Sequence, residues 1–157
     1  MDVEKRIMGK RLLIVDDEQD ILDTLVELLD GCKINTAKSF GEAKKLLEVN
    51  QYDIAVLDIF GVSGYDLLKI ANSRRIPAIM LSVQPLTNEN LKHAAEEGAA
   101  YYAPKDRLKY IASFIENVLE AKDRGKSPWI GMFDRLGIND KRFQGTHWRD
   151  QEKEFWE

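Results

Sequence analysis

The feature that most constrains the fold of this chain is an alternation between short apolar runs and segments with helical periodicity. The runs "LLIV" at 12–15 and "IAVL" at 54–57 contain no polar residue. Uninterrupted apolar runs of this kind are typical of strands that are buried on both faces of a sheet. The sequence predicts strands at 11–16, 32–37, 53–58, 76–82 and 100–103.

Helical segments with local capping signals follow these strands. Leu, Ile and Val recur at helical spacing through 21–29, where Asp17 is expected to cap the helix and Gly31 to end it. Ser39 and Glu42 form a capping-box pattern at the start of the next helix. The remaining helices are expected to start at Ser63, at Thr87 and near Leu108.

This order of elements predicts an α/β fold, a doubly wound parallel sheet of five strands with helices on both faces. In such sheets, ligands bind beyond the carboxyl ends of the strands, where the strand order reverses. Polar and charged residues follow these ends, namely Asp16, Asp17, Asp58, Ser82 and Lys105. We therefore expect these side chains to converge at one edge of the sheet.

Three carboxylates gathered at one place cannot all stay ionised without a counter-charge. Mg²⁺ is a suitable counter-charge because it prefers oxygen ligands and is often held by only one or two carboxylates plus water. An aspartate beside Mg²⁺ is a competent nucleophile toward phosphorus, and the Lys105 ammonium and the Ser82 hydroxyl could hold phosphoryl oxygens. The cluster therefore indicates phosphoryl transfer to an aspartate.

The motifs that carry these residues resemble those of the response-regulator receiver domain of bacterial two-component signalling, across 10–121. The matching pieces, in order and at the expected strand ends, are "VDDE" (15–18), "VLDIF" (56–60), "IMLS" (79–82) and "GAAYYAPK" (98–105). The resemblance implies a chemotaxis-regulator-like, flavodoxin-like fold with strand order 2-1-3-4-5. It also implies a receiver domain over 1–121 and an extension over 122–157.

Each site residue has a role by this resemblance. Asp58 would accept phosphate from a phosphohistidine on a sensor histidine kinase or phosphotransfer protein. The metal ligands would be Asp17, Asp58 and the Phe60 carbonyl directly, with Asp16 acting through water. Lys105 would hold the phosphoryl group. Ser82 and Tyr102 would form a switch pair in which the serine moves toward the phosphate and the ring turns inward.

The chain also departs from the family pattern. The loop "DIFGVSGYD" is shorter than usual, and the order Pro104-Lys105 removes the usual Lys-Pro bond. These departures leave a second function open, that of a pseudo-receiver acting as a constitutive protein-interaction module. A phosphatase using Asp58 is a third function, but Phe60 stands where such enzymes generally need a second acid.

The segment 122–157 differs in composition from the rest. Pro128 and several glycines interrupt any long helix, and all three tryptophans lie here. The segment is too short for a usual DNA-binding output domain. Its aromatic residues are expected to pack on the receiver's own surface, or else to bind a second subunit or another protein.

The composition of the chain limits which partners and which cellular compartment we expect. The net charge of −4 gives no basic footprint for direct nucleic-acid binding, and no apolar stretch is long enough for membrane insertion. The single cysteine, Cys32, excludes an internal disulfide and fits a reducing compartment. We expect a cytoplasmic protein that is not a classical enzyme. It would signal through an unknown downstream protein or as a homodimer.

Overall fold

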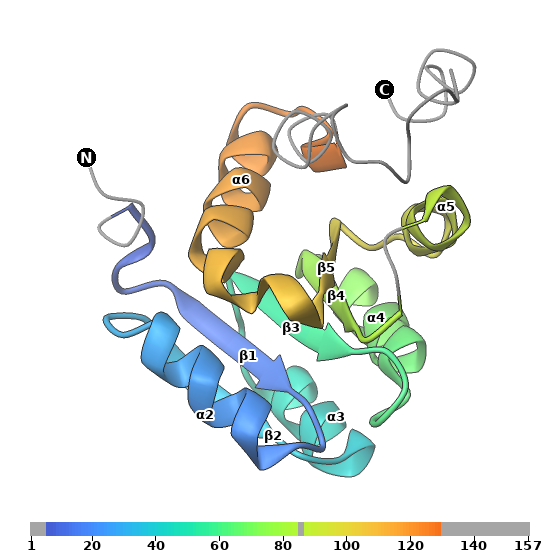
Figure 1. Cartoon of the computed structure of the whole chain (residues 1–157). Coiled ribbons are helices and arrows are strands. Elements are labelled where there is room, and N and C mark those ends of the chain that lie inside the picture. Colours follow the sequence, from blue (N-terminus) through green and yellow to red (C-terminus); the bar gives the residue numbers. More distant parts are fainter. Residues whose placement is uncertain (1–5, 85–86, 130–157) are drawn as a thin grey trace.

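The computed structural model describes residues 6–84 and 87–129, which form a parallel sheet with helices on both faces (Figure 1). The strand order is β2-β1-β3-β4-β5, and every neighbouring pair is parallel. The strands are β1 (Arg11–Val15), β2 (Lys33–Ala37), β3 (Ile54–Asp58), β4 (Ala78–Ser82) and β5 (Tyr101–Pro104). The predicted fold class and strand order are therefore confirmed.

Most strand residues are buried, including all of the edge strand β5, and the other edge strand, β2, is the exception. All residues of the central strands β3 and β4 are buried, which explains why these segments contain so few polar residues. In the edge strand β2, most residues are at least partly exposed. The strands that provide the candidate site are thus held on both faces by the core.

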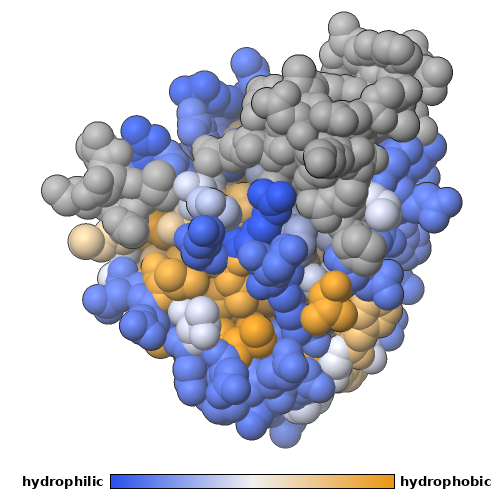
Figure 2. Space-filling model, in the orientation of Figure 1, coloured by the Kyte–Doolittle hydropathy of each residue, from blue (hydrophilic) through white to orange (hydrophobic). Residues whose placement is uncertain are grey.

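Helices α2 and α6 cover one face of the sheet, and α3, α4 and α5 cover the other (Figure 1). Hydrophilic residues dominate the outer surface of the face shown in Figure 2, and apolar residues come to the surface between α2 and α6. The helices are α2 (Gln19–Leu28), α3 (Phe40–Val49), α4 (Gly64–Ser73), α5 (Asn88–Glu96) and α6 (Ile111–Asp123). A 3₁₀ turn, η1 (Lys105–Tyr110), precedes α6. Every helix in the described part of the chain is too short or too polar to cross a bilayer.

The local capping signals gave mixed results. Ser39 Oγ accepts a hydrogen bond from the Glu42 amide (3.2 Å), and Thr87 Oγ1 accepts one from the Asn90 amide (3.1 Å), as predicted. The prediction that Asp17 caps α2 was wrong. The residue at the N-cap is Glu18, and its side chain makes no capping hydrogen bond.

The loop between β3 and α4 turns very tightly. The Gly64 amide donates to the Ile59 carbonyl (2.9 Å), and a Cβ on Gly64 would collide with the Asp58 carbonyl oxygen. Ser63 takes a left-handed φ of 56° at the N-cap of α4. Glycine at 64 is therefore required by close approach of the backbone to β3, and this approach compensates for the short loop.

Past α6, the chain folds back on the sheet at Trp129, which is buried. Its indole Nε1 donates to the Ala99 carbonyl (3.2 Å), and its ring stacks on Tyr101 with centroids 6.1 Å apart. Tyr101 stacks in turn on Phe114 of α6 at 5.2 Å. The start of the aromatic-rich extension thus packs on the surface of the same folded unit. The prediction for the rest of it, residues 130–157, lies outside the described residues.

Candidate functional site

The carboxyl ends of four parallel strands bring the candidate site together. Asp16 directly follows β1, Asp58 ends β3, Ser82 ends β4 and Lys105 directly follows β5. Strand register aligns Asp58 with Leu81 and Ser82 with Pro104, so these ends lie level with each other. The parallel topology therefore gathers residues that are far apart in the sequence.

The three aspartates form a compact oxygen cluster. Asp16, Asp17 and Asp58 each place a carboxylate oxygen so that the three atoms lie within 4.8 Å of one another. Asp16 and Asp58 are buried, and Asp17 is exposed at the mouth of the cluster. The predicted convergence of these residues is therefore present in the structure.

Lys105 supplies the positive charge of the cluster. Its Nζ lies 2.9 Å from Asp16 Oδ2 and 3.1 Å from Asp58 Oδ1. A third carboxylate oxygen, Glu18 Oε2, lies 3.1 Å from the same nitrogen. The lysine thus touches two of the three clustered aspartates and one further acid.

Burial and the nearby charges shift the pKa values of Asp16 and Lys105. Burial raises the pKa of Asp16, and the hydrogen bond from the Glu18 amide and the contact with Lys105 oppose that rise without cancelling it. For Lys105, burial alone would lower the pKa, but its three carboxylate partners together raise it above the ordinary lysine value. Lys105 therefore stays charged, while Asp16 carries a cost for its own charge.

The cluster fits a hard divalent cation by its donor set. Its donors are carboxylate oxygens, and Asp16 Oδ2 is buried without an aligned hydrogen bond, which leaves a lone pair for a cation. Gly61 lies so close to the carboxylates of Asp17 and Asp58 that a Cβ at this position would collide with both of them. The Gly61 amide also donates to Asp58 Oδ2 (2.8 Å) and so fixes the orientation of that carboxylate.

The two residues of the expected switch pair are linked through Gln84. The Gln84 amide donates to Ser82 Oγ (3.0 Å), and the Tyr102 hydroxyl donates to the Gln84 carbonyl (3.2 Å). Both Ser82 and Tyr102 are buried, so the ring of Tyr102 is already inward here. Burial raises the pKa of the Tyr102 hydroxyl, against the opposing effect of Ser82.

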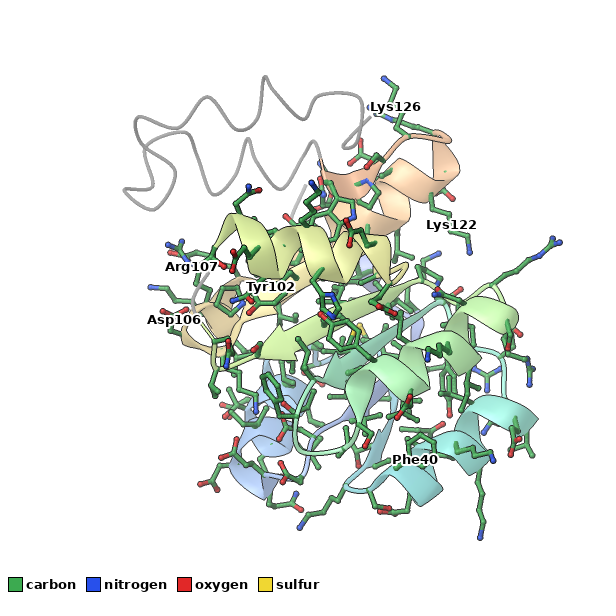
Figure 3. All side chains as sticks on the ribbon, turned by 90° about the vertical axis from the view of Figure 1, so that its right-hand side faces the viewer. Phe40, Tyr102, Asp106, Arg107, Lys122 and Lys126 are labelled. Carbon is green, nitrogen blue, oxygen red and sulfur yellow. The ribbon has the colours of Figure 1, made fainter. Side chains whose placement is uncertain are left out.

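A cavity of about 390 Å³ adjoins these residues, lined in part by Ser82, Gln84, Tyr102 and His93. Figure 3 shows Tyr102 at the same end of the molecule as Asp106 and Arg107, while Lys122 and Lys126 lie at the other end of α6. The Tyr102 side chain therefore lies away from the C-terminal end of α6.

Sequence reasoning missed two residues of the site. Glu18 was part of the "VDDE" motif, but its contact with Lys105 joins residues far apart in the chain. Gly61 lies in the short loop after β3, and its closeness to Asp17 and Asp58 is the structural reason for glycine there. For Phe60, whose carbonyl is an expected metal ligand, the structure shows an exposed side chain. The carbonyl's role stays a prediction.

The chain is similar to known proteins across this region. A family model for the response regulator receiver domain matches residues 12–112. Two-component response regulator ARR18 of Arabidopsis thaliana is 29% identical over 124 residues, which cover 74% of this chain and 19% of that protein. Two-component response regulator ORR24 of Oryza sativa subsp. japonica is 29% identical over 136 residues, covering 79% and 22%. The chain spans about a fifth of the length of these curated relatives.

Solved structures share the fold. A CheY-like response regulator receiver domain protein from Methanospirillum hungatei JF-1 has a TM-score of 0.66 and 27% identity, covering 74% of this chain and 98% of that one. The receiver domain of the Francisella response regulator 1452 has a TM-score of 0.65 at 24% identity, covering 73% and 99%. The second similarity supports the fold alone.

Proposed function

Since this chain belongs to the response regulator receiver domain family of two-component systems, we propose that it is a phosphorylation-switched receiver with Asp58 as phosphoacceptor. The observation that carries the proposal is the oxygen cluster of Asp16, Asp17 and Asp58, in which the Lys105 ammonium pairs with Asp16 and Asp58. The phosphoryl donor would be a phosphohistidine on a sensor histidine kinase or a phosphotransfer protein. The protein would work in the cytoplasm beside that donor.

In the proposed reaction, a carboxylate oxygen of Asp58 attacks phosphorus, the P–N bond breaks, and the imidazole leaves with the electron pair. Asp16, Asp17, Asp58 and the Phe60 carbonyl would hold Mg²⁺, which would neutralise charge on the phosphoryl oxygens. Lys105 would donate to a further phosphoryl oxygen. The Gly61 amide, which donates to Asp58 Oδ2 in the structure, would keep the Asp58 carboxylate oriented.

The proposed response to phosphorylation runs through Ser82 and Tyr102. If Ser82 Oγ turns toward the phosphoryl group, it must leave the Gln84 amide that now donates to it. The Tyr102 hydroxyl donates to the carbonyl of the same residue, so a shift of Gln84 would reach the ring. The output would be contact with a downstream protein, and homodimerisation stays a prediction.

The alternative function, a constitutive pseudo-receiver, has less support. The shortened loop and the missing Lys-Pro bond favour the pseudo-receiver. All peptide bonds of the described residues are trans. The complete set of aspartates and the well-placed lysine oppose the pseudo-receiver, because a purely structural module has no need to bury Asp16 at a cost. A phosphatase is not favoured either, since exposed Phe60 supplies no acid.

Incubation of the full chain with acetyl phosphate tests the proposal. In Mg²⁺ the intact mass is expected to rise by one phosphoryl group, because metal and Lys105 together neutralise the incoming charge. With Mg²⁺ replaced by a chelator, the mass is expected to stay unchanged. No mass increase in Mg²⁺ with several small phosphodonors would favour the pseudo-receiver.

Mg²⁺ is also expected to stabilise the unphosphorylated protein, because it relieves repulsion among the three aspartates. At about ten times its Kd, a ligand specific for the folded state adds about 1.4 kcal/mol, which is roughly 3–6 °C in Tm for a chain of this size. Thermal melts with Mg²⁺ or chelator measure this shift. Asp16→Asn should lose most of it, and Asp30→Asn, an exposed control, should keep it.

The same melts have a predicted pH dependence without metal. The pKa of Asp16 is raised in the folded state. At pH values between the ordinary pKa of aspartate and this raised pKa, the folded protein keeps a proton on Asp16 that the unfolded chain has lost. Stability attributable to Asp16 should therefore fall as pH rises through that interval. Asp16→Asn should remove this fall and raise the metal-free Tm. An unchanged pH profile in that variant would contradict the electrostatic account.

A further inference from the structure

The ammonium group of Lys105 is surrounded by carboxylates, and it donates a hydrogen bond to Glu18 Oε2 (3.1 Å). A lysine ammonium has three N–H groups, and Nζ of Lys105 lies within ion-pair distance of three oxygens, from Asp16, Asp58 and Glu18. Its side chain is only 11% exposed, so water has little access to it. A phosphoryl oxygen that approaches this nitrogen would therefore compete with these three carboxylates for its N–H groups.

The three partners differ in what their release would cost. Asp16 is fully buried, and losing its cation would leave a buried charge without a partner. Asp58 would itself carry the phosphoryl group and must stay beside Lys105. The Glu18 side chain is 59% exposed, so water can solvate its carboxylate as soon as it leaves the lysine.

We propose that Glu18 is a placeholder, which occupies the donor of Lys105 that a phosphoryl oxygen takes and leaves it on phosphorylation. This inference rests on the proposed function and assigns a residue to its regulation. Glu18 is thus a positioning residue that competes with the phosphoryl group.

The location of Glu18 gives the exchange a structural consequence. Glu18 is the N-cap residue of α2, and its side chain makes no capping hydrogen bond while it contacts Lys105. A carboxylate near a helix N-terminus is stabilised by the helix dipole. The released Glu18 side chain therefore has a favourable place at the start of α2, where phosphorylation would leave its negative charge without the lysine partner.

The test uses beryllofluoride, a phosphoryl mimic, with the full chain in Mg²⁺. Removing the competing charge in Glu18→Gln is expected to tighten beryllofluoride binding about two- to fivefold, the range expected for one exposed ion pair. Binding is measured by titration with thermal shift or tryptophan fluorescence. Asp20→Asn is the matched control, because Asp20 is an exposed acid in the first turn of the same helix.

The outcomes separate the inference from the proposed function. Tighter binding in Glu18→Gln but not in Asp20→Asn supports the placeholder. Equal tightening in both variants would show a general charge effect and overturn it. Unchanged or weaker binding in Glu18→Gln, with normal binding by the wild type, would overturn it and leave the proposed function intact. Failure of the wild type to bind would contradict both.

Discussion

Replacing Asp58 with asparagine is expected to abolish phosphoryl incorporation. The amide has nearly the same shape as the carboxylate and can still accept the hydrogen bond from the Gly61 amide, so the loop after β3 should be kept. It lacks the anionic oxygen that attacks phosphorus and the charge that pairs with Lys105 at 3.1 Å. We expect a complete loss of the mass increase seen with the wild type.

The other aspartates provide graded controls for this experiment. Asp17→Asn should slow incorporation without abolishing it, because this substitution removes an expected metal ligand and leaves the nucleophile. Asp30→Asn, exposed beyond the end of α2, should behave as the wild type. Circular dichroism confirms that each variant is folded. Phosphoryl incorporation in a folded Asp58→Asn variant would assign the acceptor to another residue.

Replacing Trp129 with alanine is expected to lower the free energy of unfolding by about 3 kcal/mol, the lower end for truncating a buried aromatic residue. The indole is 6% exposed, covers the ring of Tyr101, and makes a hydrogen bond to the Ala99 carbonyl that alanine cannot replace. Chemical denaturation measures the loss, and the corresponding decrease in Tm is roughly 6–12 °C.

A second substitution separates the two contributions of Trp129. Phenylalanine keeps an aromatic ring against Tyr101 but has no N–H for the Ala99 carbonyl, so Trp129→Phe should lie between the wild type and Trp129→Ala. A loss below about 0.5 kcal/mol in Trp129→Ala, the range of ordinary surface substitutions, would contradict a stabilising role. The expected result would place the boundary of the folded unit beyond residue 121.

Much of the fold could be predicted from the sequence because its signals are local or periodic. The buried strands β3 and β4 need apolar residues on both faces, so their runs are easily recognised. The caps at Ser39 and Thr87 depend on neighbours three residues away. The strand order depended on resemblance to a known family, since periodicity alone gives no pairing.

The errors and omissions at the site have a tertiary origin. Asp17 has the residue type and position of a helix cap, but it lies beside Asp58 and Gly61 in the acidic cluster. The contact between Glu18 and Lys105 joins α2 to the end of β5, and no local pattern encodes it. The requirement for glycine at 61 comes from the carboxylates it lies against, which only the folded chain brings together.

The most direct test of the account is to identify the phosphorylated residue chemically. Borohydride reduces an acyl phosphate to an alcohol, which would convert the phosphorylated aspartate to homoserine. After reaction with acetyl phosphate and Mg²⁺, reduction and trypsin digestion, fragmentation of peptide 46–69 should place homoserine at Asp58. Peptide 12–33, which contains Asp16 and Asp17, should be unmodified. Homoserine at Asp16 or Asp17, or none in either peptide, would contradict the assignment of Asp58 as the phosphoacceptor.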